Sequence, residues 1–79
     1  MNTVIFEKVK QILVDNLNVS ADEIKPESEL VNDLGINSLE LADLILVCED
    51  KFNIVIEDED LNTLLTVGDI VNYLEEKVK

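Results

Sequence analysis

The chain of 79 residues contains no histidine and no arginine, and it has a single cysteine, Cys48. Without histidine, Ser-His and Cys-His catalytic arrangements and histidine-based metal sites are excluded. No glycine-rich phosphate-binding loop is present either. With one cysteine no internal disulfide can form, so we expect a reducing, cytoplasmic setting. These absences predict a protein that is not an enzyme.

Long apolar runs and an excess of positive charge are also missing. No stretch approaches the ~20 apolar residues of a membrane-spanning helix, and the first residues lack the basic and apolar regions of a signal peptide. Eighteen acids against six lysines give a net charge of −12, which disfavours nucleic acid and anionic membranes as partners. Such a surface predicts a protein partner with a basic patch, although solubility alone is a simpler explanation of the acidity.

The acidity is concentrated between Asp33 and Asp60. Nine acids and one lysine in this stretch carry −8 of the net −12. Repulsion among these charges predicts that salt or millimolar divalent cations raise the melting temperature. The acidic run at 57–60 does not begin an EF-hand loop, because Asn62 and Gly68 stand where that loop requires glycine and glutamate.

The spacing of apolar residues predicts three longer helices. The first covers about 4–17, and the second runs from Ser38 to about 51 or 52, with Asn37 as its N-cap. The third opens at a capping box that begins with Thr66. Cys48 falls on the apolar stripe of the second helix, where we expect it to be a small buried hydrophobe.

The connections between these helices are irregular. We expect one turn at 20–24, an extended connector at 53–56 and a short helix near 59–64. The long first connection needs apolar anchors, for which the candidates are Val19, Ile24, Leu30, Val31, Leu34 and Ile36. Since no pair of strands is indicated, the fold class is all-α. It is a small antiparallel bundle of three longer helices and one short helix, forming one monomeric domain over 1–79.

Ser38 stands where a loop becomes a helix. Asn37 already serves as the N-cap, with Glu40 completing a capping box, so the Ser38 hydroxyl is left free for solvent. Gly35 permits a backbone conformation that other residues resist. Uncapped amides and the positive end of the helix dipole favour a phosphate attached at this place. Capping alone explains many such serines, but here the pattern favours a serine that is modified.

The stretch at 33–40, DLGINSLE, resembles the Asp-Leu-Gly-x-Asp-Ser-Leu motif of bacterial type II acyl carrier proteins. The whole chain is similar to that family in length, order of elements and acidity. In the family the serine takes 4′-phosphopantetheine from coenzyme A, and the distal thiol carries acyl groups as thioesters. The resemblance implies that Ser38 is loaded by a phosphopantetheinyl transferase and delivers acyl groups to fatty acid synthase-type enzymes.

Asn37 departs from the motif, because the family usually has aspartate before the serine. Asparagine caps a helix about as well, so we expect no effect on the fold. What is lost is a charge beside the attachment site. Slower loading, or a need for a cognate transferase, is therefore expected, and Asn37→Asp should speed loading.

The resemblance also implies a surface that docks on basic patches of partner enzymes. The residues that resemble the family's recognition positions are the acids Asp33, Glu40, Asp43, Glu49, Asp50 and Asp58 and the apolar residues Leu39 and Leu46. Helix acids more often form only a solvated face. We further expect an acyl chain to be sheltered between the second helix and the segment that follows it.

Other carriers and one other class of protein remain alternatives. A peptidyl carrier normally has a second glycine where this chain has Ile36, and a D-alanyl carrier is matched less well at 35–37. A stand-alone polyketide carrier fits the same residues. The chain is otherwise explained as an unmodified acidic helical adaptor that binds a basic partner.

Overall fold

The computed structural model describes residues 2–78 and is all-helical. Helix α1 spans Thr3–Leu17, α2 spans Ser38–Phe52 and α3 spans Val67–Lys77. Two 3-10 helices lie between them, η1 at Ala21–Glu23 and η2 at Asp58–Thr63. The predicted fold class and the predicted order of elements are confirmed. The outer limits of the predicted 1–79 domain lie outside the described residues.

Capping residues explain where α2 and α3 start and where α2 ends. Asn37 accepts a hydrogen bond from the Glu40 amide and Glu40 accepts one from the Asn37 amide, which completes the predicted capping box of α2. Thr66 and Asp69 form the same box at α3. Asn53 ends α2 in the left-handed conformation with φ 55°, which asparagine adopts more readily than most residues.

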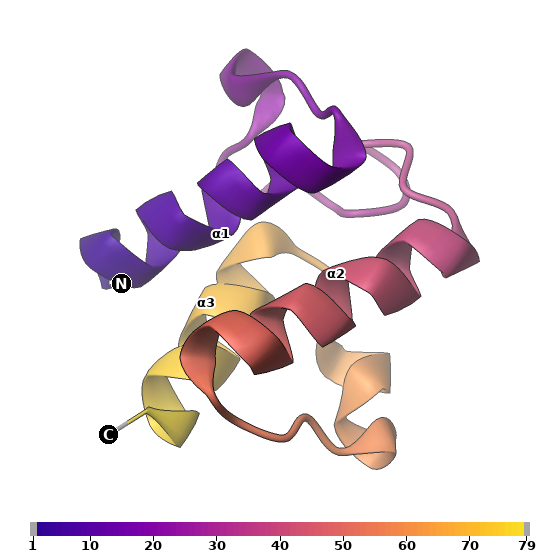
Figure 1. The fold of residues 1–79 in the computed structure, drawn as a ribbon. Coiled ribbons are helices and arrows are strands. Elements are labelled where there is room, and N and C mark those ends of the chain that lie inside the picture. The colour runs from indigo at the N-terminus through magenta and orange to yellow at the C-terminus, as the bar shows by residue number, and fades with distance from the viewer. Residues whose placement is uncertain (1, 79) are drawn as a thin grey trace.

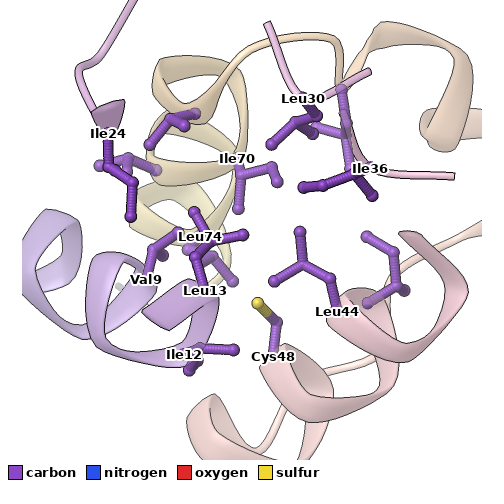
Figure 2. Close-up of a cluster of buried hydrophobic side chains, with 14 of the residues drawn as sticks. Val9, Ile12, Leu13, Ile24, Leu30, Ile36, Leu44, Cys48, Ile70 and Leu74 are labelled. Carbon is purple, nitrogen blue, oxygen red and sulfur yellow. The ribbon is translucent and has the colours of Figure 1, made fainter. Parts of the chain in front are cut away.

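The three long helices surround one apolar core. Figure 1 shows α1 and α2 side by side and antiparallel, with α3 at an angle to both and passing behind the last turns of α2. Figure 2 shows Leu13 from α1, Leu44 from α2 and Leu74 from α3 meeting at the centre, and none of the three has any solvent exposure. The Cα radius of gyration is 11.2 Å, close to the ~12 Å expected for a folded chain of this length.

The connections contribute to this core, with some departures from expectation. Ile24, Leu30 and Ile36 are buried as predicted (Figure 2). The prediction was wrong for Val31, which is 57% exposed. Residues 29–34 coil into a turn in which neighbouring side chains point in different directions, and Leu30, not Val31, faces inward.

The segment before α2 is tied to the start of α3. The Leu30 amide donates to the Leu65 carbonyl over 2.9 Å, and the Val67 amide donates to the Ser28 carbonyl over 3.0 Å. Ser28 is itself buried and donates its hydroxyl to the Glu23 carbonyl. These bonds satisfy backbone groups that would otherwise be orphaned under the helices. The entry into α2 is thereby fixed in place.

Among residues 2–78, no helix is long and apolar enough to cross a membrane.

Candidate functional site

Ser38 is the first residue of α2 and is exposed to solvent. The capping hydrogen bonds are made by Asn37, whose side-chain oxygen lies 2.8 Å from the Glu40 amide. Within the described residues, no hydrogen bond involves the Ser38 hydroxyl. In a serine that caps its own helix, the side-chain oxygen accepts a hydrogen bond from a backbone amide. The Ser38 oxygen makes no such bond and remains available for modification.

Gly35 sets the angle at which the chain enters α2. Its φ is +68°, and the space around its missing side chain is open, with no atom within 4 Å of an ideal Cβ. The requirement for glycine is therefore conformational and not steric. The next residue, Ile36, is almost fully buried, and its amide donates to the Leu30 carbonyl over 3.0 Å. Together they present Asn37 and Ser38 at the surface.

The first turn of α2 suits a phosphate on the serine. Within residues 2–78, the backbone amides of Ser38 and Leu39 have no acceptor, as is usual for the first amides of a helix. These amides and the helix dipole stabilise negative charge at this end. Glu40 opposes that effect modestly through its own charge. The residues present therefore fit a phosphodiester on Ser38.

A groove of about 390 Å³ begins at Ser38 and follows α2 toward its C-terminal half. One wall is α2, and the other is the connector after α2 together with η2. The lining residues are Ser38, Leu41, Ala42, Ile45, Leu46, Glu49, Ile56, Asp58, Leu61 and Leu64. We call this the α2–η2 groove. Most of these side chains are apolar, so the groove suits an aliphatic chain attached near Ser38.

The eight predicted docking residues lie on α2 or beside it, and the structure divides them by their surroundings. Leu39 and Leu46 are 81% and 62% exposed, so both can contact a partner directly. Asp43, Asp50 and Asp58 are exposed and have no hydrogen-bond partner among residues 2–78.

The other three docking acids are bound to backbone amides. Asp33 accepts from the Glu29 amide over 2.7 Å, Glu40 belongs to the capping box, and Glu49 accepts from the Ile56 amide over 2.8 Å. Glu49 is also partly buried. The predicted acids are therefore of two kinds, with Asp43, Asp50 and Asp58 the freer to meet a partner.

Cys48 is fully buried on the core side of α2, with its sulfur directed at the apolar cluster (Figure 2). Burial, with a smaller contribution from the charge of Glu49, raises the pKa of the thiol from 9.0 to about 12. The thiol therefore stays protonated and unreactive at neutral pH. Within residues 2–78, no cluster of three or more acidic or cysteine side chains is placed to hold a metal ion.

The sequence did not indicate two parts of this site. Leu61 and Leu64 line the groove, although the short apolar spacing near 59–64 predicted only a turn of helix. Tyr73 on α3 is the second part, since its place in the sequence gives no sign of a contact with η2. Its ring packs against the core, and its hydroxyl donates to Asp60 over 2.8 Å, which connects α3 to η2. The Leu-x-x-Leu spacing of Leu61 and Leu64 was the sequence signal that could have indicated this apolar wall.

Comparison with known proteins agrees with this geometry. A family described as "Phosphopantetheine attachment site" matches residues 7–74. The chain is 46% identical over 71 residues to the acyl carrier protein of Wolinella succinogenes, with 90% of this chain and 93% of that protein covered. It is 45% identical over 71 residues to the acyl carrier protein of Clostridium acetobutylicum, with 90% and 92% covered. It is 43% identical over 72 residues to that of Helicobacter pylori, with 91% and 92% covered. The chain therefore belongs to the acyl carrier protein family, whose members are carriers and not enzymes and bear 4′-phosphopantetheine.

Proposed function

We propose that this protein is a carrier that holds 4′-phosphopantetheine on Ser38 and presents acyl thioesters to the enzymes of fatty acid synthesis. The observation that carries the proposal is a solvent-exposed hydroxyl at the first residue of α2, with the capping role taken by Asn37. Family membership implies exchange with a phosphopantetheinyl transferase and with fatty acid synthesis enzymes in general. The bound group supplies the thiol on which acyl groups are carried.

The residues around Ser38 have separate tasks in this proposal. The Ser38 oxygen forms the phosphodiester, and the amides of Ser38 and Leu39 lie where they can donate to its phosphate oxygens. Gly35 and Ile36 hold the serine outward. The buried and protonated Cys48 does not compete with the carrier thiol, because thiolates and not thiols are the nucleophiles.

The attachment is tested by the intact mass of the protein after incubation with coenzyme A, magnesium and a broad-specificity phosphopantetheinyl transferase. We expect one phosphopantetheine-sized gain in the wild type and none in Ser38→Ala. A gain that persists in Ser38→Ala would place the group elsewhere. No gain in either the wild type or Asn37→Asp would favour the unmodified acidic adaptor.

Asn37 is proposed to limit the choice of transferase. Its side chain caps α2 with a single oxygen, which an aspartate at this position would supply equally well, so Asn37→Asp adds charge without loss of the cap. We expect Asn37→Asp to load faster and to melt at nearly the same temperature. Equal loading rates for the two proteins would show that the missing charge is irrelevant.

The docking surface is proposed to be the exposed face of α2 with Asp58 beside it. Asp43, Asp50 and Asp58 provide negative charge, and Leu39 and Leu46 provide exposed apolar contacts. Such a surface fits enzymes with a Lys/Arg patch, because opposite charge speeds encounter and apolar contact adds specificity. Asp33, Glu40 and Glu49 add to the negative field while they accept hydrogen bonds from the amides of Glu29, Asn37 and Ile56.

Charge reversal tests this surface against a matched site on α1. Asp43→Lys should slow association with the transferase at low salt, whereas Glu7→Lys, at an exposed position on α1, should change it much less. Each rim charge is worth less than about 1 kcal/mol. The rates are measured by stopped-flow mixing at two salt concentrations. Equal slowing by both variants would show that only the net charge of the protein matters, which would contradict a docking surface on α2.

The α2–η2 groove is proposed to shelter the acyl chain. Its lining begins at the attachment residue, and Ile56, Leu61 and Leu64 form its wall opposite α2. Burial of each methylene in such a groove contributes ~0.8 kcal/mol. We further propose a single carrier domain over residues 1–79 that is monomeric and cytoplasmic. Light scattering on the loaded protein tests the monomer, and cell fractionation tests the location.

A further inference from the structure

The wall of the α2–η2 groove opposite α2 is held weakly by packing. None of the six residues of η2, Asp58–Thr63, is buried. The buried apolar side chains of this stretch, Ile56 and Leu64, lie just before and just after it. In the middle of the wall, Leu61 packs against the core but is only partly buried, so polar contacts add to the hold on this segment.

Two polar contacts, which we call the latches, add to this packing, one at the start of the wall and one in its middle. In the first, the Ile56 amide donates to the Glu49 carboxylate of α2 over 2.8 Å. In the second, the Tyr73 hydroxyl of α3 donates to the Asp60 carboxylate over 2.8 Å. The Tyr73 oxygen also accepts from the Glu57 amide over 3.4 Å. One latch therefore ties the wall to α2 and the other ties it to α3.

We propose that Glu49 and Tyr73 are positioning residues that set how far the α2–η2 groove opens, and thereby the acyl chain length that the carrier shelters best. The inference rests on the proposed shelter. A short chain fits the closed groove of about 390 Å³, whereas a longer chain needs the wall carrying Leu61 to move outward. Outward movement breaks the latches, so their strength opposes long chains.

The size of the effect follows from comparing a latch with a methylene. Burial of one methylene favours the sheltered state roughly fourfold. A hydrogen bond to a charged carboxylate opposes opening roughly tenfold to a hundredfold. Loss of one latch should therefore shift the best-sheltered chain by about two or three methylenes toward greater length. Short chains should become less protected, because the loosened wall fits them less closely.

The test is the rate at which hydroxylamine cleaves a series of acyl thioesters, from four to about sixteen carbons, on the purified acylated protein without any partner enzyme. Glu49→Ala removes the acceptor, whereas Glu49→Gln keeps an oxygen for the Ile56 amide and should preserve most of the wild-type profile. Tyr73→Phe removes only the hydroxyl and should shift the profile in the same direction as Glu49→Ala. Glu7→Ala, which removes a charge on α1, should leave the profile unchanged.

Amide hydrogen exchange of the unacylated protein supplies a second readout. Glu49→Ala should speed exchange at Ile56 roughly tenfold or more, with the amides of α1 unaffected. Equal acceleration throughout α1 would mean that the substitution only destabilises the fold, which would overturn the positioning role. An unchanged chain-length profile in both Glu49→Ala and Tyr73→Phe would overturn this inference alone. A wild-type thioester as labile as free acyl pantetheine would overturn the proposed shelter together with it.

Discussion

The two segments that flank α2 are held to the molecule in different ways. The segment before it, 26–37, buries Ser28, Leu30 and Ile36 and exchanges backbone hydrogen bonds with the start of α3. The segment after it, 53–64, fully buries only Ile56 and Leu64 and packs Leu61 against the core half-buried. The side chains of Glu49 and Tyr73 bind it at Ile56 and Asp60. The first segment presents Ser38, and the second forms the outer wall of the groove.

This difference matches the work proposed for each segment. An attachment serine must be offered to a transferase in one geometry, which a segment with buried anchors provides. A groove that accepts chains of different length needs a wall that moves, and weakly packed segments open at low free energy. In this proposal, the segment before α2 presents the serine rigidly, and the segment after α2 adjusts to the acyl chain.

The largest expected effect comes from truncating a leucine on each side. Leu30→Ala should lower the free energy of unfolding by about 2–5 kcal/mol, because Leu30 is 1% exposed and its loss leaves a cavity. Leu61→Ala removes the same atoms from a partly exposed site and should cost less than about half as much. Urea unfolding of both variants measures the difference. Equal losses would erase the contrast between the two segments; Leu30→Val serves if Leu30→Ala does not fold.

The thiol of Cys48 distinguishes opening of the groove wall from unfolding of the core. Its pKa is raised to about 12 in the folded protein by burial, against 9.0 when exposed. Between these values the unfolded state has released a proton that the folded state keeps, so stability falls as pH rises. The slope approaches about 1.4 kcal/mol per pH unit and is absent in Cys48→Ala. Urea unfolding from pH 8 to 10.5 gives both slopes, and parallel curves would contradict the burial of the thiol.

Labelling of the same thiol extends this test. At neutral pH the loaded protein should show one reactive thiol and the unloaded protein none, since only the carrier thiol reaches solvent. Glu49→Ala should loosen the wall without exposing Cys48, because the sulfur points into the core and Cys48 does not line the groove. Reactive Cys48 in that variant would mean that the wall and the core open together.

The sequence predicted the regular elements well because their signals are local. Capping residues at Asn37 and Thr66 mark the starts of α2 and α3, and the spacing of apolar residues marks the buried faces. The resemblance of the stretch at 33–40 to the motif of carrier proteins is enough to single out Ser38. These features depend on neighbours within a few positions along the chain.

What the sequence did not predict depends on contacts between distant residues. Val31 and Leu30 are equally apolar, and only the bond from the Leu30 amide to Leu65 and the turn around it decide which one faces the core. The contact of Tyr73 with Asp60 joins residues 13 positions apart and has no periodic signal. Which docking acids are hydrogen-bonded also depends on contacts beyond the nearest neighbours in sequence. Glu49, for example, is bound by the Ile56 amide seven positions away.

A smaller effect is expected at Gly35, within the anchored segment. Gly35→Ala should cost about 1–2 kcal/mol, because an L side chain disfavours φ +68°, while no atom lies close enough to clash. Gly35→Asn should cost less, since asparagine enters this conformation more readily. Urea unfolding measures both, and transferase loading reports whether Ser38 is displaced. An alanine variant as stable as the wild type would show that the turn relaxes freely.

The smallest expected effect on stability comes from charge, and it should arise in the segment after α2, which forms the groove wall. The acids at 57–60 lie in or just before η2, where little apolar burial offsets their repulsion. Sodium chloride and magnesium should both raise the free energy of unfolding by ~0.5 kcal/mol, and hence the melting temperature by roughly 2–4 °C, through screening and loose binding.

Removal of one of these charges provides the control. Glu59→Gln, at an exposed position, should raise the melting temperature at low salt and shrink the response to added salt. Glu7→Gln on α1, where two lysines neighbour the acid in sequence, should do neither. If both variants respond alike, the repulsion is spread over the whole molecule, and the weak hold on the groove wall owes nothing to its charge. If only Glu59→Gln responds, cations and basic partners act on the same side that the latches hold.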